Sequence, residues 1–581
     1  MACSKATSSS SFWPLRRMGV PVPRFREGPC SRSTQQRDSM RRKVAERVNR
    51  SVDALNEIAG CGCWRGNPEE EFSSAHAAVV HNLWDAHLDA RPDDVIPTAR
   101  EAFKMLRGES SPGAYGLPTN LASYQKDRLS MPSELIKAAE LSQLVPECDR
   151  SQVVNFEQEC LRPIAEVQAL REELGDITPY FDPLLRASWR KYSEFLHSLH
   201  RVGMVRWSLS RKERVTPFFV KKKNGKIRLI IDARRVNRRC RPPPKCRLGS
   251  TASLIDIELF ENEVLFHASS DIQHCFHHFQ LPREIQEYFG LDPLPAKILG
   301  VRTVDGQQVS GETLIYPLIT TAPMGFSWSM YWCQRAHEEC LDSAAPDAQE
   351  AGLGPSRRLK ERAPFPGWYS SPRDPAWDYE TRDPSKSVCA NLIYADNNAV
   401  FGIQQRKVVK CFQDLTTAVT DRHLPLHEIQ KSSDRGDLLG VHIDGVAGLV
   451  RPTKTRLWRV RQAFQYLACA PRVTGPEVLH LIGHATYLFL INRSLMCLFR
   501  SLYDFAARAE GRTKLWPSAA REASWVCDLI MLARSDLRRL MGSWVVCTDA
   551  SEGGFGVTAA HMPLSRVRRT GCWHELWRCK D

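Results

Sequence analysis

The sequence has no uninterrupted apolar run long enough to cross a bilayer. Its most apolar stretch, residues 487–499, contains Asn492 and Arg493 and is shorter than the ~20 residues of a spanning helix. This stretch predicts a buried helix. A secretory signal pattern is also missing. We therefore expect an intracellular protein, nuclear or cytoplasmic, that is neither secreted nor held in a membrane.

The sequence also lacks a disulfide framework and zinc-ligand spacing. Its 19 cysteines are scattered, which favours reduced intracellular thiols over the paired cysteines of a small secreted domain. Two candidate pairs, Cys61 with Cys63 and Cys572 with Cys579, do not have the spacing of zinc ligands. We interpret them as structural or incidental.

Acidic residues are fewer than basic ones. The chain has 80 Lys and Arg against 66 Asp and Glu, a formal net charge of +14. This excess favours a polyanionic partner such as nucleic acid, although a solvated basic surface gives the same composition. Acids are sparse in the first 50 residues, which are rich in Ser and Arg and contain several prolines. Residues 1–55 are predicted to be a disordered basic arm, with an organellar targeting segment as the alternative.

After this arm, residues 56–200 show apolar residues at helical spacing, as in the series Leu161, Ile164, Val167 and Leu170. We predict a helical N-terminal region there, without identifiable chemistry.

From Val215 the pattern changes to strands. Residues 215–232 form two apolar runs around Asn224-Gly225, a strong hairpin signal. The turn is flanked by Lys221, Lys222, Lys223, Lys226 and Arg228. Such a basic hairpin suits a triphosphate or a nucleic-acid backbone. A solvated edge hairpin protected by lysines is the alternative.

Two acids lie where strands are predicted to end. Asp271 closes the apolar run that begins at Val264, and Asp396 lies at the tip of a hairpin formed around Tyr394-Ala395-Asp396-Asn397. Carboxylates on rigid elements suit metal-dependent phosphoryl transfer, which depends on positioning and on neutralisation of phosphate charge. Either acid alone could instead be a helix or turn cap.

Further motifs follow in a fixed order. A glycine-containing turn, Pro323-Met324-Gly325-Phe326, opens an aromatic-rich helix, and a proline-rich irregular insert is predicted over residues 343–387. Lys431 and Leu438-Leu439-Gly440 come after the Asp396 hairpin. Together with the basic hairpin and Asp271, this series resembles the fingers and palm of a retroelement reverse transcriptase over roughly residues 213–445.

The resemblance implies an α+β, right-hand polymerase fold. It would comprise the helical extension, fingers and palm over 201–445, thumb- or connection-like helices over 446–540, and a truncated ribonuclease H-like start over 541–581. The last part rests on Asp549, which follows an apolar strand and precedes a Gly-rich turn. Ribonuclease H activity is not expected, because the other carboxylates of that fold are missing from the sequence.

The resemblance also implies roles for single residues. Asp271 and Asp396 would bind Mg²⁺ or Mn²⁺, with Asn397 as a further ligand or replaced by water. Phe276 would exclude a ribose 2′-hydroxyl, although plain core packing explains such an aromatic equally well. The remaining roles are nucleotide binding by Lys223, Arg228 and Gly325, protonation of the leaving pyrophosphate by Lys431, and primer positioning by Leu439 and Gly440. Lys431 has an exposed structural lysine as its alternative, and the choice of Lys223 is uncertain by one residue.

Two positions depart from the family pattern. Met324 stands where many relatives have a polar or small aromatic residue, which removes a hydrogen bond but not the turn. Asn397 stands where most relatives have a second hairpin aspartate, so one negative charge is missing and metal affinity should fall. Three interpretations follow. The element has lost its catalytic activity, or it works with Asn397 or water completing the metal coordination, or its palm binds nucleic acid without catalysis.

The predicted function is RNA-directed DNA synthesis by a retrotransposon-type element, of the long-terminal-repeat or tyrosine-recombinase type. The partners would be an RNA template, a DNA primer and deoxynucleoside triphosphates. The alternative is a catalytically decayed, nucleic-acid-binding protein derived from such an element. An RNA-templated RNA polymerase is a third class, which an aromatic residue at position 276 argues against.

Overall fold

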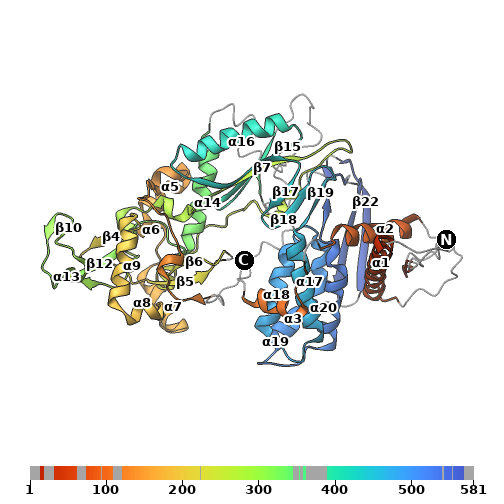
Figure 1. The fold of residues 1–581 in the computed structure, drawn as a ribbon, viewed down its shortest axis with the longest axis horizontal. Helices are drawn as coiled ribbons and strands as arrows, with labels where there is room; N and C mark the ends of the chain where they lie inside the picture. The colour runs from red at the N-terminus through yellow and green to blue at the C-terminus, as the bar shows by residue number, and fades with distance from the viewer. Residues whose placement is uncertain are drawn as a thin grey trace. The chain divides into compact units, whose positions relative to one another are not determined.

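The computed structural model describes residues 14–18, 32–61, 74–92, 95–108, 121–222, 224–344, 353, 358–360, 389–539, 542–551, 554–564 and 566–567. The chain has a mixed α+β fold, as the sequence predicted (Figure 1). It divides into two compact units. The smaller comprises Met1–Thr119, Leu439–His442 and Leu449–Asp536, and the larger comprises Asn120–Leu438, Ile443–Gly448 and Leu537–Asp581.

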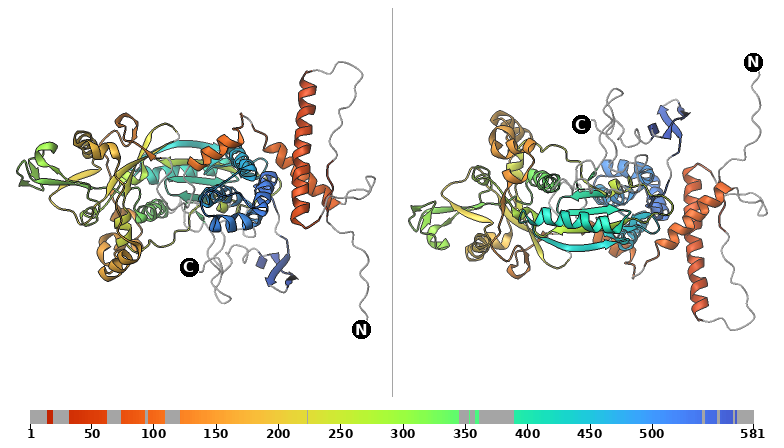
Figure 2. Two further views of the ribbon diagram at one scale, coloured as in Figure 1. Left: turned by 90° about the horizontal axis from the view of Figure 1, so that it is seen from below. Right: turned by 90° about the horizontal axis from the view of Figure 1, so that it is seen from above.

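A five-stranded sheet forms the centre of the larger unit, in the order β13-β14-β15-β7-β16. Its strands are β13 (Arg358–Leu359), β14 (Ala390–Tyr394), β15 (Asn397–Gly402), β7 (Phe266–Ile272) and β16 (Leu426–Ser433). Two long helices, α14 (Ser327–Asp342) and α16 (Gln405–Thr420), contact each other and pack on this sheet (Figures 1 and 2). Apolar side chains on alternate strand positions, such as Ala268 and Val400, join the helices in one core.

A second sheet carries the predicted basic hairpin. β5 (Thr216–Lys221) and β6 (Ile227–Asp232) pair across the Asn224-Gly225 turn, which confirms the hairpin. Their outer edges are not free, because β1 (Leu121–Ala122) pairs with β5 and β2 (Leu129–Ser130) pairs with β6. Each of these pairings covers two residues of the hairpin, and Lys221 and Lys226 beside the turn are exposed. The hairpin is therefore the centre of a four-stranded sheet and carries exposed lysines at its tip.

The other elements of this unit are mostly short. The strands are β3 (Ala139–Glu140), β4 (Val205–Ser208), β8 (Phe279–Gln280), β9 (Leu294–Pro295), β10 (Thr303–Val304), β11 (Gln307–Gln308), β12 (Leu314–Ile319) and β17 (Arg435–Leu438). The helices are α4 (Leu141–Leu144), α5 (Glu147–Val154), α6 (Phe156–Glu159), α7 (Ile164–Leu174), α8 (Pro183–Ala187), α9 (Trp189–Arg201), α10 (Arg234–Arg239), α11 (Thr251–Leu254), α12 (Arg283–Gln286) and α13 (Ala296–Leu299).

The smaller unit is largely helical. It contains α1 (Arg32–Ile58), α2 (Ser74–Asp89), α3 (Ala99–Gly108), α17 (Lys454–Cys469), α18 (Gly475–Phe489), α19 (Arg500–Arg508) and α20 (Pro517–Leu529), with strands β19 (Leu449–Pro452) and β20 (Ser535–Asp536). β18 (Val441–Asp444) is divided between the two units. The buried side chains of α17, among them Trp458 and Phe464, form one core with α3 and α20. The predicted helices over 446–540 are therefore present.

The predicted disordered arm is wrong for residues 32–55. These residues belong to α1, whose Val44, Val48 and Val52 are buried against α2 in a cluster that also contains Leu83. Apolar residues four apart lie on one face of a helix, and this short series is diluted by the many basic residues around it. Residues 1–13 and 19–31 lie outside the described residues.

The structure also bears on two other predicted regions, residues 56–200 and the insert 343–387. The described residues between 56 and 200 are helical in large part, but the two units divide this region near Thr119. The insert 343–387 contributes the edge strand β13, and most of its remaining residues lie outside the described part. Where the chain is described, no helix is long and apolar enough to span a membrane.

Candidate active site

The two predicted acids converge at neighbouring strand ends. Asp271 is the penultimate residue of β7, and Asp396 lies in the two-residue turn between β14 and β15. Strands β15 and β7 are antiparallel, with Asn397 opposite Asp271, and the Ile272 N–H donates to the Asp396 carbonyl at 2.8 Å. The sheet register therefore places the two carboxylates side by side, although they are distant in the sequence.

The electrostatics of this pair favour a cation. Burial raises the pKa of Asp271 to about 6, and the neighbouring Asp396 charge contributes to that rise. Burial also raises the pKa of Asp396, against the opposing effect of the Arg228 charge. The Oδ1 atom of Asp271 is buried and accepts no hydrogen bond. Two repelling carboxylates with an unsatisfied oxygen fit a divalent ion, which would satisfy that oxygen and relieve the repulsion.

The protein supplies few ligands beyond these two acids. Within the described ranges, no group of three or more His, Cys, Asp or Glu side chains has the arrangement of a metal site. Mg²⁺ is commonly held by one or two carboxylates together with substrate phosphates and water. The pair fits that pattern of ligation.

Asn397 contacts its neighbouring acid. Its Nδ2 atom donates to Asp396 Oδ1 at 3.0 Å. The amide thus stabilises the ionised form of Asp396 and occupies one of its oxygen atoms. An aspartate at position 397 would instead repel Asp396 and add a negative charge.

Basic side chains of the hairpin lie within electrostatic reach of the acids. Lys222 Nζ donates to Ser130 Oγ at 3.2 Å. Burial lowers the pKa of Lys222, the Arg228 charge lowers it further, and the Asp271 charge opposes this shift. Lys223, the lysine chosen from the sequence, lies outside the described residues. Lys222 and Arg228 are thus the hairpin cations that the structure associates with the acid pair.

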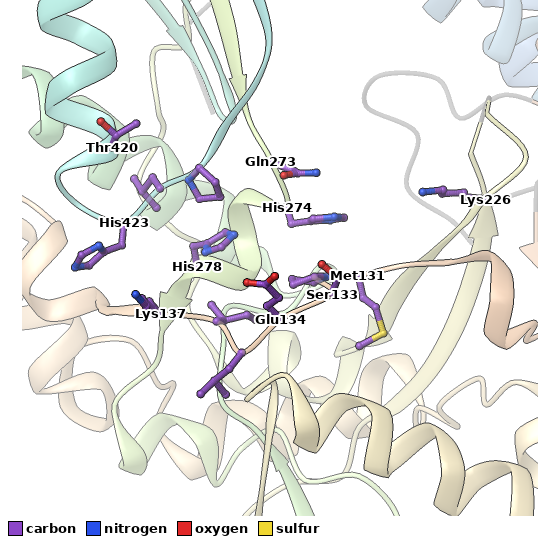
Figure 3. A pocket seen from close by; sticks show the side chains of 15 residues that line it. Met131, Ser133, Glu134, Lys137, Lys226, Gln273, His274, His278, Thr420 and His423 are labelled. Carbon is purple, nitrogen blue, oxygen red and sulfur yellow. The ribbon is translucent and has the colours of Figure 1, made fainter.

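A cavity of about 580 Å³ lies beyond the end of the β7 strand. Four segments line it: residues 131–137, the hairpin at Lys226, residues Gln273 to His278, and residues 420–425 (Figure 3). Burial lowers the pKa of His274 to about 4, so this imidazole is neutral at pH 7. The size is typical of a small-molecule site, and Lys226 supplies a cation at its wall.

Phe276 and Gly325 both lie in the larger unit. Phe276 belongs to a short 3-10 helix, Cys275–His278, and is half-buried against the core. Gly325 has φ +114°, and a Cβ there would lie 2.1 Å from the Ile231 carbonyl oxygen of β6. The close approach at Gly325 is therefore made to the hairpin backbone.

The structure does not bring Lys431 to the acids. Lys431 is exposed on β16 and lines a groove against α16 with Phe412 and Thr416. Asp271 lies on the other face of the sheet, because it alternates along β7 with Ile272, which belongs to the core under α16. His427 is the β16 residue opposite Asp271, and its Nδ1 atom donates to the Asp271 carbonyl at 3.1 Å.

In the sequence, the only indication that His427 could lie near the acids is its position four residues before Lys431. The bulges in β16 between His427 and Ser433 change which side chains face the acids. Those irregularities cannot be read from apolar alternation. The role predicted for Lys223 stays a prediction, because that residue lies outside the described part of the chain.

The predicted primer-positioning residues lie in the smaller unit. Leu439 has φ +50°, and its carbonyl accepts a hydrogen bond from the Tyr487 hydroxyl. The Arg456 guanidinium lies 4.1 Å from the centre of the Tyr487 ring, and a Cβ on Gly440 would approach Arg456 Nη1 to 2.7 Å. These contacts make a fixed turn at Leu439-Gly440.

Asp549 lies in β21 (Trp544–Ser551), opposite Gly556 of β22 (Gly554–His561). The two predicted strands are therefore present and paired, and the metal role of Asp549 stays a prediction.

Under the polymerase function that the sequence predicts, we expect His427→Ala to lower primer extension at least tenfold and Lys431→Ala to change it less than threefold. The reason is position: an imidazole opposite Asp271 can hold or donate a proton near the acids, and general acids typically contribute about 10²–10⁴-fold. Steady-state extension rates of both variants check this. A large loss with Lys431→Ala alone would contradict the placement.

Comparison with known proteins gives a likeness in fold. The sequence matches no protein-family model and no curated protein. Two solved structures are similar: the foamy viral protease-reverse transcriptase dRH in complex with double-stranded DNA, and the foamy viral protease-reverse transcriptase in complex with double-stranded DNA. Both are 13% identical to this chain and cover 74% of it, with TM-scores of 0.41 and 0.40. The matches span 69% and 80% of those two chains.

Proposed function

We propose that the protein is an RNA-directed DNA polymerase of a retrotransposon-type element. The observation that carries this proposal is the Asp271 and Asp396 pair at adjacent strand ends, with one buried oxygen unsatisfied. Basic side chains of the β5–β6 hairpin act on both acids electrostatically. Paired carboxylates next to cations suit nucleotidyl transfer, in which a hydroxyl attacks a triphosphate and pyrophosphate leaves.

The residues would share this chemistry as follows. Asp271 and Asp396 would hold Mg²⁺ or Mn²⁺, which when bound activates the primer hydroxyl and neutralises phosphate charge. Lys222 and Arg228 would bind the triphosphate. His427 would hold a proton near the leaving group. Phe276 would discriminate against ribonucleotides by steric exclusion of the 2′-hydroxyl.

The second candidate function is nucleic-acid binding without catalysis. The Asn397 contact favours it, because the amide satisfies Asp396 without supplying a negative charge. Fewer ligand charges weaken divalent-ion binding. RNA template and DNA primer are the expected partners under either function.

Asn397→Asp separates the two candidates. We expect the natural protein to extend a DNA primer on a poly-A RNA template with Mn²⁺ and, more weakly, with Mg²⁺. Asn397→Asp should lower the Mg²⁺ concentration needed for half-maximal rate by about tenfold, because it adds a ligand charge. Metal titrations of the extension rate measure this.

Asp271→Ala is the reference for zero activity in that experiment. If the natural protein is as inactive in primer extension as Asp271→Ala while Asn397→Asp is active, the result supports a polymerase that has lost its activity. If all three are equally inactive, the polymerase proposal is wrong, and salt-dependent binding of a primer–template duplex then tests the binding-only function.

A further inference from the structure

The residue before Asp396 has an unusual backbone conformation. Ala395 has φ +53°, which L side chains rarely adopt. Both of its backbone polar groups are held by side chains of α14. Its N–H donates to Gln334 Oε1 at 2.8 Å, and its carbonyl accepts a hydrogen bond from His337 Nδ1 at 2.8 Å. Strained residues of this kind persist where surrounding contacts fix them.

His337 continues toward the other acid. Its Nε2 atom accepts from Asn398 Nδ2 at 3.3 Å, and Asn398 Oδ1 accepts from the Ser270 hydroxyl at 2.6 Å. Ser270 directly precedes Asp271. All three side chains are buried, with His337 and Asn398 both at 0% exposure. A chain of hydrogen bonds therefore joins the residue before Asp396 to the residue before Asp271.

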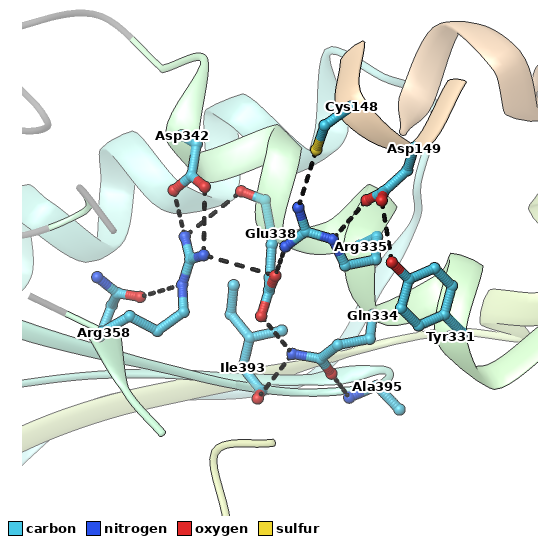
Figure 4. A network of polar contacts seen from close by, with 11 residues as sticks. Cys148, Asp149, Tyr331, Gln334, Arg335, Glu338, Asp342, Arg358, Ile393 and Ala395 are labelled. Carbon is cyan, nitrogen blue, oxygen red and sulfur yellow. Dashed lines mark hydrogen bonds and ion pairs between the residues drawn. The ribbon is translucent and has the colours of Figure 1, made fainter. Parts of the chain in front are cut away.

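Gln334 is itself held in one orientation. Its Nε2 atom donates to the Ile393 carbonyl at 3.2 Å and to Glu338 Oε1 at 3.0 Å (Figure 4). Glu338 pairs with Arg335, which also donates to Asp149 at 2.6 Å. Since Oε1 accepts from Ala395 and Nε2 donates to Ile393, Gln334 contacts the main chain at two points of the hairpin.

We infer that Gln334 and His337 are positioning residues that set the separation of the Asp271 and Asp396 carboxylates. The inference rests on the proposed function for the reaction being positioned. One helix reaches the residue before each acid: it contacts the Ala395 backbone directly, and it is linked through Asn398 to the Ser270 side-chain hydroxyl. Loss of either contact would let the Asp396 turn relax, while the hairpin strands, which pair over five residue positions, remain.

The test compares Gln334→Met with Tyr331→Phe. Methionine keeps the length of the side chain and removes both hairpin contacts. Tyr331→Phe removes one buried hydrogen bond of the same helix, to Asp149 at 2.9 Å, and none to the hairpin. We expect Gln334→Met to lower kcat for primer extension by about tenfold to a hundredfold, with the nucleotide KM within about twofold, because displaced reacting groups lose rate. Tyr331→Phe should leave kcat within about threefold.

A rescue variant distinguishes positioning from a general loss of stability. Glycine adopts positive φ without steric cost, so Ala395→Gly in the Gln334→Met background should recover about threefold or more of the lost kcat. If Gln334→Met matches Tyr331→Phe in kcat, or if Ala395→Gly recovers nothing, the inference is overturned.

One readout does not need activity, so it separates this inference from the proposed function. Hydrogen exchange of the peptide spanning residues 390–402 should be about tenfold faster in Gln334→Met than in Tyr331→Phe. Unchanged exchange would overturn the inference even in an inactive protein, whereas inactivity alone would overturn only the polymerase proposal.

Discussion

Asp271→Asn should abolish primer extension and at the same time stabilise the folded protein at pH 7. The two effects have one origin, the buried position of this carboxylate beside Asp396. Asparagine keeps the shape but supplies a neutral oxygen, so a divalent ion held by the two acids would lose one charged ligand. We expect a loss of activity on the order of a thousandfold or more, as for other removed electrostatic groups in active sites.

The gain in stability follows from the direction of the pKa shift. Burial and the Asp396 charge raise the pKa of Asp271 from 3.8 to about 6, so the folded protein binds this proton more tightly than the unfolded chain does. Its contribution to the free energy of unfolding therefore falls as pH rises from about 4 to 6 and stays low above that window. The asparagine side chain of the variant does not titrate. We expect Asp271→Asn to raise the free energy of unfolding by roughly 1–2 kcal/mol at pH 7 and by almost nothing at pH 4.

Denaturant unfolding at pH 4, 5, 6 and 7 measures this difference, without added divalent ions. Asp421→Asn is a matched control, because Asp421 is exposed at the end of α16. It should change stability by less than about 0.5 kcal/mol at every pH. Equal stability of Asp271→Asn and natural protein at pH 7 would show that the carboxylate is not desolvated as described.

Gly325→Ala should destabilise the larger unit by about 3–5 kcal/mol, among the largest effects of a single substitution. Two costs combine. The φ of +114° is unfavourable for alanine, and its Cβ would overlap the Ile231 carbonyl oxygen at 2.1 Å. The clash would be with β6 backbone that is already hydrogen-bonded to this turn, since the Ile231 N–H donates to the Met324 carbonyl at 2.8 Å. Relief would require β6 to separate from this turn.

Gly300→Ala is the control for the conformational part of this cost. Gly300 also has positive φ, +63°, but a Cβ there meets nothing within 4 Å. We expect it to cost only about 1 kcal/mol. Urea denaturation of both variants measures the two values. Similar costs would mean that β6 yields to the added methyl group.

The hairpins of this protein were predicted from local chemistry. Asn224-Gly225 between two apolar runs specifies a turn, and Asp396 between two apolar runs specifies a hairpin tip, because only a few neighbouring residues determine each. The same holds for the helix that opens after Gly325. The proximity of Asp271 and Asp396 was inferred from the family resemblance and is present in the sheet register.

Long-range pairing and burial decided the rest. Lys431 lies against α16 because bulges in β16 alter which residues face the acids, and the α1 helix exists because three valines of a basic segment pack against α2. Gln334 and His337 have no local pattern that marks them, since a polar residue inside a helix is distinguished only by what it contacts.

The sequence by itself determined the two acids, the basic hairpin, the glycine turn and the missing charge at Asn397, because residue type and neighbouring residues define each of them. Only the tertiary structure decided how these parts meet. Strand register brings the acids together, α14 contacts the backbone before Asp396, and burial raises the pKa of both carboxyls. Strand pairing, hydrogen bonding and burial depend on which residues lie close together in space, and separation along the chain does not determine that.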